Sequence, residues 1–119
     1  MNPNPIISLP VKASTALVAH RRVKVGTGAK VEYAGASDTS IGTVLQDCDA
    51  TVPDRAQAAV HLRGNGINYV TYGTATALTA GDELVGAANG KVTKGSSSPI
   101  GVALEAATAD GDIIRAILY

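Results

Sequence analysis

The chain has 119 residues, a length typical of one domain, and its ten basic and ten acidic residues give a formal net charge of zero. A domain that lives on nucleic acid usually carries a basic excess, and four tyrosines with no Trp or Phe offer few platforms for base stacking. We therefore expect no direct nucleic-acid partner, and we expect no membrane association because no apolar run approaches the length of a span.

The first segment is apolar and rich in proline. Prolines at positions 3, 5 and 10 exclude a helix or a central strand and push their neighbours toward extended geometry. We predict an extended N-terminal arm over residues 1–15 and a single β domain over residues 16–119. Ile6, Ile7 and Leu9 are too apolar for a tail in water, so the arm either packs back onto its own domain or lies along another subunit or partner. No charged region precedes an apolar run, so we expect no signal peptide.

The rest of the chain predicts short strands separated by turns rich in Gly, Ser and Asn, and this order occurs twice. The matched segments are Lys30-Val31 with Lys91-Val92, Ile41-Gly42 with Ile100-Gly101, and Val60-His-Leu62 with Ala116-Ile-Leu118. Their spacing shortens by a few residues along the chain, as loop deletions would produce. We predict an all-β fold, a small pseudo-symmetric β-barrel or sandwich whose related halves span about 20–62 and 80–119.

The segment between the halves predicts a hairpin. Arg55–Arg63 and Ile67–Tyr72 have strand character, and Gly64-Asn-Gly66 between them is typical of a tight turn. We therefore expect residues 63–79 to bridge the halves as a hairpin followed by a Thr/Ala linker. Residues 16–25 alternate like one continuous strand, and the aliphatic composition predicts one modest core.

No catalytic, cofactor or metal set is recognisable in the chain. His20 and His61 each lie in a predicted strand beside an Arg, where a structural role is the default. Cys48 is the one cysteine, so it cannot form an internal disulfide. Three loop acids lack the Gly and the distal Glu of a calcium loop; they are Asp47, Asp49 and Asp54. We expect no enzyme activity, no cofactor and no metal.

One basic cluster stands out, and it contains His20, Arg21, Arg22 and Lys24. The ordinary interpretation is a solvated strand edge, where charges discourage aggregation. The alternative is a salt bridge to an acidic patch on a partner. The candidate partner-contact residues are Ile6, Ile7, Leu9, Arg21 and Arg22.

Five short motifs follow one another along the chain. They are V-x-L-R-G at Val60–Gly64, L-T-A-G-D-x-V/L at Leu78–Leu84, G-K-V-T at Gly90–Thr93, I-G-V-A-L-E-A-A at Ile100–Ala107, and G-D-x-I/V-x-x-x-L at Gly111–Leu118. Their order and spacing, over about residues 16–119, resemble the capsid decoration (cement) proteins of tailed bacteriophages, a family often described only as a domain of unknown function.

The resemblance implies a structural protein of the virion. Such a protein binds the outer surface of the expanded capsid and stabilises the head by bridging subunits of the major capsid protein. It commonly does so as a homotrimer at three-fold or quasi-three-fold positions, and it is made in the cytoplasm of the host bacterium. The family has no catalytic residues to transfer. The alternative is a small ligand- or carbohydrate-binding β-module displayed on a virion or cell surface, which the scarcity of aromatic residues disfavours.

Overall fold

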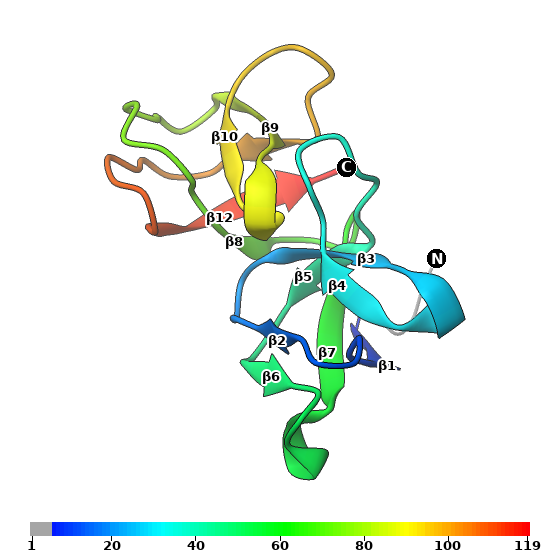
Figure 1. The fold of residues 1–119 in the computed structure, drawn as a ribbon. Coiled ribbons are helices and arrows are strands. Elements are labelled where there is room, and N and C mark those ends of the chain that lie inside the picture. The colour runs from blue at the N-terminus through cyan, green and yellow to red at the C-terminus, as the bar shows by residue number, and fades with distance from the viewer. Residues whose placement is uncertain (1–5) are drawn as a thin grey trace.

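Short strands and tight turns make up the regular structure of residues 6–119, the part of the chain that this computed structural model describes (Figure 1). The strands of the first half are β1 (Ile6–Pro10), β2 (Ala16–Leu17), β3 (Arg22–Val25), β4 (Val31–Tyr33), β5 (Gly42–Val44), β6 (Cys48–Asp49) and β7 (Gln57–Leu62). Those of the second half are β8 (Asn68–Thr71), β9 (Glu83–Gly86), β10 (Val92–Lys94), β11 (Gly101–Ala103) and β12 (Ile113–Leu118). One-turn 3-10 helices lie at η1 (Thr27–Ala29), η2 (Pro53–Arg55) and η3 (Ala88–Gly90). Within this range no helix is long and apolar enough to cross a membrane.

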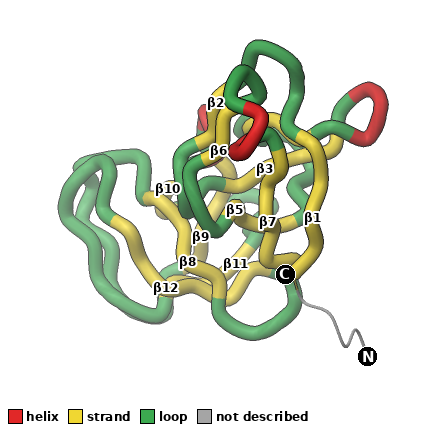
Figure 2. The backbone as a smooth tube through the Cα atoms, turned by 90° about the horizontal axis from the view of Figure 1, so that it is seen from below, coloured by secondary structure: helices red, strands yellow, loops and turns green. Residues whose placement is uncertain are grey.

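The strands form two five-stranded antiparallel sheets, one from each half of the chain. The first has the order β1-β7-β5-β3-β4 and the second β8-β12-β11-β9-β10. A parallel bridge brings the two edges of each sheet together, between Val11 and Val31 in the first and between Tyr72 and Val92 in the second. Each sheet therefore curls toward a small barrel, and Figure 2 shows the two curled sheets side by side.

The predicted internal repeat is confirmed by the register of the two sheets. Gly42 pairs with Leu62 and Val44 with Val60 in the first, as Gly101 pairs with Leu118 and Ala103 with Ala116 in the second. The outer strands agree as well, because β1 pairs with β7 as β8 pairs with β12. The all-β, pseudo-symmetric fold expected from the sequence is thus the observed one.

Each half has a hydrophobic core of its own. The first cluster draws its buried residues from Val11 to Val60 and the second from Val70 to Leu118. Alternation along each strand produces this burial, as in β12, where Ile114, Ala116 and Leu118 face inward between exposed neighbours. The expectation of one shared core is wrong, because each sheet wraps around its own aliphatic side chains instead of facing the other.

The repeated Ile-Gly step has a steric reason. A Cβ at Gly42 would collide with the backbone carbonyl of His61 on the next strand, and a Cβ at Gly101 would meet that of Ile117. The sharp curl of each sheet brings the neighbouring backbone this close. Only glycine fits such an approach, so the motif marks equivalent bends in the two halves.

The predicted hairpin over residues 63–79 is wrong, because β7 and β8 belong to different sheets. β7 already has β1 and β5 on its two sides, so β8 pairs with β12 instead. The turn residues Gly64 and Gly66, both with positive φ, carry the chain from one sheet to the other. The predicted strand over 16–25 is also divided, since His20 has a φ of 66° between β2 and β3.

The two halves meet across a polar seam. Four polar side chains there are buried: Arg22, Thr43, Asn68 and Thr71. The guanidinium of Arg22 donates to the backbone carbonyls of Lys91 and Ala87 in the second half, at 2.9–3.1 Å, and also to that of Gly35. Burial lowers the pKa of Arg22, and the charge of Asp38 opposes that shift. A charge enclosed in this way holds the halves in one relative position.

The seam has further hydrogen bonds on both sides of Arg22. The amide of Asn68 donates to the hydroxyl of Thr43 at 3.0 Å, and the backbone N–H and hydroxyl of Thr71 both donate to the carbonyl of His20. The backbone N–H of Gly90 donates to the carbonyl of Ala34. A Cβ at Gly90 would meet the backbone of Arg22, so glycine is required where the turn touches the first half.

Two turns with the sequence Ala-Gly-Asp or Asp-Gly-Asp precede β9 and β12. Asp82 accepts hydrogen bonds from the backbone N–H and the hydroxyl of Thr79, and Asp112 accepts from the backbone N–H of Ala109. Gly81 and Gly111 supply the positive φ that each turn needs. The hydrogen bond from the Thr79 backbone is the main cause that lowers the pKa of Asp82, with smaller contributions from the Thr79 hydroxyl and Lys94.

We predict that Arg22→Ala destabilises the fold by about 2–4 kcal/mol, because it leaves buried carbonyls without a donor and opens the seam. Urea unfolding of the purified chain measures this. The control is Arg115→Ala, which removes only an exposed ion pair with Glu105 and should cost at most about 1 kcal/mol. Equal losses in the two variants would contradict the role given to Arg22.

The Asp82 turn should make stability depend on pH. Its folded pKa lies below the unfolded value of about 3.9, so its contribution is complete above that value and is lost as pH falls through the folded pKa. Asp82→Ala should therefore unfold at lower urea than the wild type at pH 7, and the difference should shrink below about pH 4. Asp54→Ala, at an exposed position, is the control and should change neither the urea midpoint at pH 7 nor its dependence on pH. A difference that stays constant with pH would contradict the assignment.

Candidate functional site

The residues with catalytic potential are held separately in local contacts. The ring of His20 lies 5.7 Å from that of Tyr69, and Nε2 of His61 lies 2.8 Å from the carbonyl of Asn65. Cys48 is buried in the first core, where burial, with a smaller effect of Asp47, raises the pKa of its thiol. Across residues 6–119 no three His, Cys, Asp or Glu side chains gather where they could hold a metal ion.

Two of the three loop aspartates accept hydrogen bonds from the backbone. Asp47 accepts a hydrogen bond from the backbone N–H of Ala19, and Asp49 accepts from the N–H and hydroxyl of Thr51. These bonds from Thr51 are the main reason that the pKa of Asp49 is lowered. Asp54 is exposed in η2. The three carboxylates thus have separate surroundings.

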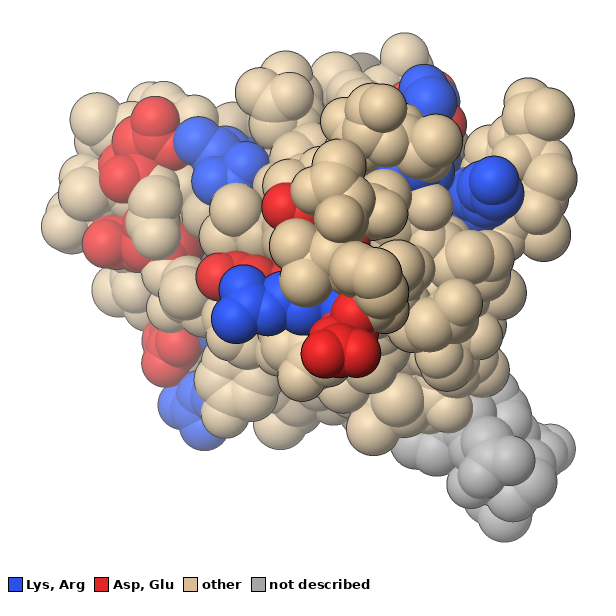
Figure 3. Space-filling view, turned by 60° about the horizontal axis from the view of Figure 1, so that its bottom comes forward, with Lys and Arg blue, Asp and Glu red and all other residues tan. Residues whose placement is uncertain are grey.

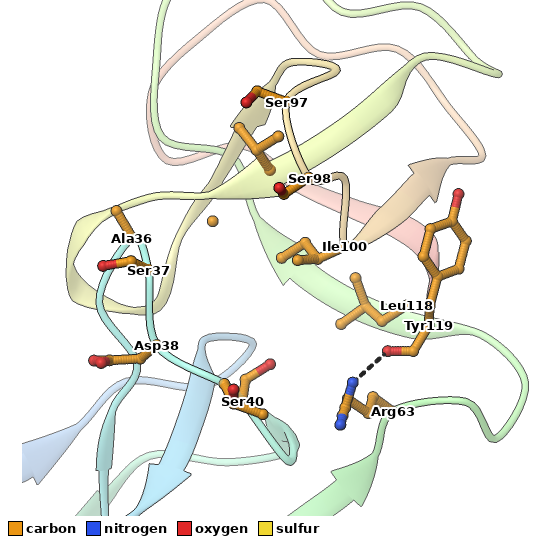
Figure 4. A pocket seen from close by; sticks show the side chains of 13 residues that line it. Ala36, Ser37, Asp38, Ser40, Arg63, Ser97, Ser98, Ile100, Leu118 and Tyr119 are labelled. Atoms are coloured by element: carbon orange, nitrogen blue, oxygen red, sulfur yellow. Dashed lines mark hydrogen bonds between the residues drawn. The ribbon is translucent and has the colours of Figure 1, made fainter.

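A cleft of about 460 Å³ opens between the halves (Figure 4). Two equivalent loops face each other across it, the β4–β5 loop with Ser37 and Ser40 and the β10–β11 loop with Ser97 and Ser98. At its base the guanidinium of Arg63 donates to the backbone carbonyl of Tyr119 at 2.9 Å. The lining combines serine hydroxyls with apolar side chains, among them Val85, Ile100 and Leu118.

The arm residues lie on the chain's own first sheet. Residues 6–10 form β1, which pairs with β7 along its whole length. Ile7 and Leu9 pack against the first core, whereas the side chain of Ile6 is 51% exposed. Of the three apolar residues proposed as contacts, Ile6 is therefore the one with a largely free side chain. A contact between this arm and a partner stays a prediction.

The two arginines of the basic cluster differ in position. Arg22 is 1% exposed inside the seam, so its side chain has no surface to offer a partner, and the expectation of a solvated edge does not hold for it. Adjacent strand positions face opposite sides, and the second half covers the side on which Arg22 lies. Arg21 is half-buried, with its guanidinium 5.4 Å from the centre of the Tyr33 ring. It remains a contact candidate.

An exposed apolar surface that the sequence analysis missed lies on the second sheet. Its largest exposed side chains, each 45–50% accessible, are Ile67, Tyr69, Ile113 and Ile117. The strict alternation of Ile113–Leu118 carries a signal for it, because inward residues on this strand must alternate with outward isoleucines. On the face shown in Figure 3, charges of both signs are scattered, with wide uncharged areas between them.

Comparisons with known proteins agree with the motifs. A family model described as a phage cement protein matches residues 1–118, which confirms the resemblance. No curated protein matches the chain.

Nineteen chains of solved structures match. One is the head fiber gp8.5 N base of bacteriophage phi29, with a TM-score of 0.75 and 17% identity over 96% of this chain and 94% of that one. At this identity the likeness shows a shared fold.

Proposed function

The chain belongs to the phage cement protein family, and we propose that it decorates the outer surface of the expanded capsid and stabilises the shell by bridging subunits of the major capsid protein. As a member of this family it is a structural protein of the phage virion. The match of the family model over residues 1–118 is the observation that carries the proposal.

The physical basis is linkage between binding and shell stability. A protein that binds the assembled lattice and not the separated subunits stabilises the lattice by mass action. Each site adds interface area that must be lost before the shell opens, and many sites multiply a small gain. The role is non-enzymatic in this proposal, and the separate local contacts of His20, His61 and Cys48 support that part of it.

The surface for the shell is proposed to include Ile6 and Arg21. Ile6 offers an exposed apolar side chain on an edge strand, and Arg21 offers a positive charge near the seam. The copies act as a homotrimer at three-fold or quasi-three-fold positions on the capsid exterior, after synthesis in the host cytoplasm.

Co-sedimentation with capsid shells tests the proposal. We expect saturable binding to expanded shells of the parent phage, no binding to unexpanded ones, and a rise in the melting temperature of the expanded shells because bound protein must first dissociate. Absence of binding to both kinds of shell would refute the proposal. A glycan screen of the free protein would then test the alternative, a ligand-binding module.

Point substitutions test the two contact residues. Ile6→Asp and Arg21→Glu should each weaken binding to expanded shells by about tenfold, and added salt should reduce binding of the wild type more than that of Arg21→Glu. Removing residues 1–9 is a poor test because it would also delete most of β1. Val52→Asp, at an exposed position in a distant loop, is the control. Unchanged binding in either contact variant removes that residue from the interface.

A further inference from the structure

The second half buries part of one face of the first sheet, around Arg22 and Thr43, whereas within residues 6–119 the equivalent part of the second sheet is open. On the first sheet a row of paired residues runs across three strands through Arg22, Thr43 and His61. The first two are buried in the seam, and His61 is half-buried. Because the two halves are equivalent, the contact between them shows which elements can cover this face of the sheet.

The register identifies the matching row on the second sheet. Glu83 pairs with Val102, and Val102 pairs with Ile117. Glu83 is exposed, Val102 is half-buried, and Ile117 is 45% exposed. With Tyr69, Ile113 and Arg115 beside it, this row forms what we call the open face; Arg115 lies between Ile113 and Ile117 and is paired with Glu105 at 3.3 Å. An exposed apolar patch on a sheet is typical of an interaction surface.

Within the chain, the covering surface comes from one turn and one strand of the second half. The turn at residues 87–91 provides the carbonyls that Arg22 bonds, and β8 provides Asn68 and Thr71. Gly86 and Gly90 of this region lie so close to the first half that a Cβ would collide with Ala36 or Arg22. This part of the second half is thus shaped for contact.

Within residues 6–119 the equivalent turn of the first half is largely exposed. The turn at residues 26–30 corresponds to the turn at residues 87–91, because the same hydrogen bond closes both. The N–H of Gly26 donates to the carbonyl of Lys30, and the N–H of Ala87 donates to the carbonyl of Lys91. Where the second half has Gly86, the first has Val25, 45% exposed. Lys30 is exposed in the same turn. The strand equivalent to β8 is β1, at an edge of its sheet.

The chemistry of the two pairs of surfaces is matched. The polar residues of the seam correspond by register to apolar ones in the equivalent positions. Thr43 corresponds to half-buried Val102, His61 to exposed Ile117, Asn68 to Ile7, which packs against the first core, and Thr71 to half-buried Pro10. Arg22, which needs acceptors, corresponds to Glu83, which needs donors, and Lys30 is a donor in the turn that would meet it. Polar surfaces meet inside the chain, whereas the exposed apolar side chain of Ile117 is left outside.

We propose that the open face binds a second copy of this chain, which docks its turn at residues 26–30 and the adjoining part of β1 there. Val25 and Ile117 lie at the centre of this contact, and Glu83 meets Lys30. The two surfaces differ, so the contact is head-to-tail and closes into a ring if the rotation allows. Self-association does not depend on the capsid role; only closure at three copies rests on the proposed function.

Sedimentation velocity of the full chain over increasing concentration tests the proposal. The wild type should associate, and Ile117→Arg and Val25→Glu should each lower the association constant by about tenfold or more, because each buries an unpaired charge in the contact. Val25 and Ile117 are both exposed, so urea unfolding of these variants should be unaltered. Val52→Glu, away from both surfaces, is the control and should associate like the wild type.

Mixing the two variants distinguishes head-to-tail contact from two-fold pairing of the open faces. Each variant keeps one intact surface, so the Val25→Glu chain offers its open face to the intact turn of the Ile117→Arg chain. We expect stronger association in the mixture than in either variant alone. No recovery in the mixture would overturn the head-to-tail arrangement.

Two other results would overturn the proposal. One is a wild type that stays monomeric at about 1 mM. The other is an Ile117→Arg variant that self-associates normally but no longer binds expanded shells. That result would assign the open face to the shell. Normal shell binding by monomeric protein would overturn only the self-association, and normal self-association without shell binding would overturn only the capsid role.

Discussion

The buried guanidinium of Arg22 is the contact on which the arrangement of the two halves depends. Each half forms its own curled sheet around its own aliphatic core, so little apolar surface is left to hold one half against the other. Arg22 instead donates to carbonyls of the turn that precedes β10. A buried charge is costly to leave unpaired, so one relative position satisfies it and displaced positions do not. The seam thus fixes the relative position of the two halves more than it adds to their binding energy.

The polar seam also explains why two halves of the same fold present different surfaces. The two sheets share strand order and register, yet the row Arg22–Thr43–His61 became a contact within the chain while Glu83–Val102–Ile117 stayed outside. A small domain without Phe or Trp has a limited aliphatic core, and it still leaves isoleucines on an outer face. An apolar outer face with a polar inner seam favours a protein that works in contact with other copies or with a lattice.

A role in a capsid is compatible with this architecture because it needs no movement and no reactive centre. The sheets are curled and tied at their edges by the bridges of Val11 with Val31 and Tyr72 with Val92, which leaves few open strand edges. Carboxylates that accept hydrogen bonds from their own turns, such as Asp82 and Asp112, fix the loops between strands. Rigid surfaces of this kind lose little conformational entropy when many copies bind one shell.

The sequence by itself determined most of the strands, the turns and the repeat, because these follow from local properties; it did not place the break at His20 between β2 and β3. Alternation along Ile113–Leu118, the glycines of equivalent bends and the order of matched motifs are all visible in the printed chain. Tertiary structure alone decided which strands pair and which charges are buried. Strand pairing depends on which edges are already occupied, and this placed β7 and β8 in different sheets instead of a hairpin. Arg21 and Arg22 are neighbours of the same type, but only Arg22 meets the carbonyls of Ala87 and Lys91, and those carbonyls come from a turn that lies close only in the folded chain.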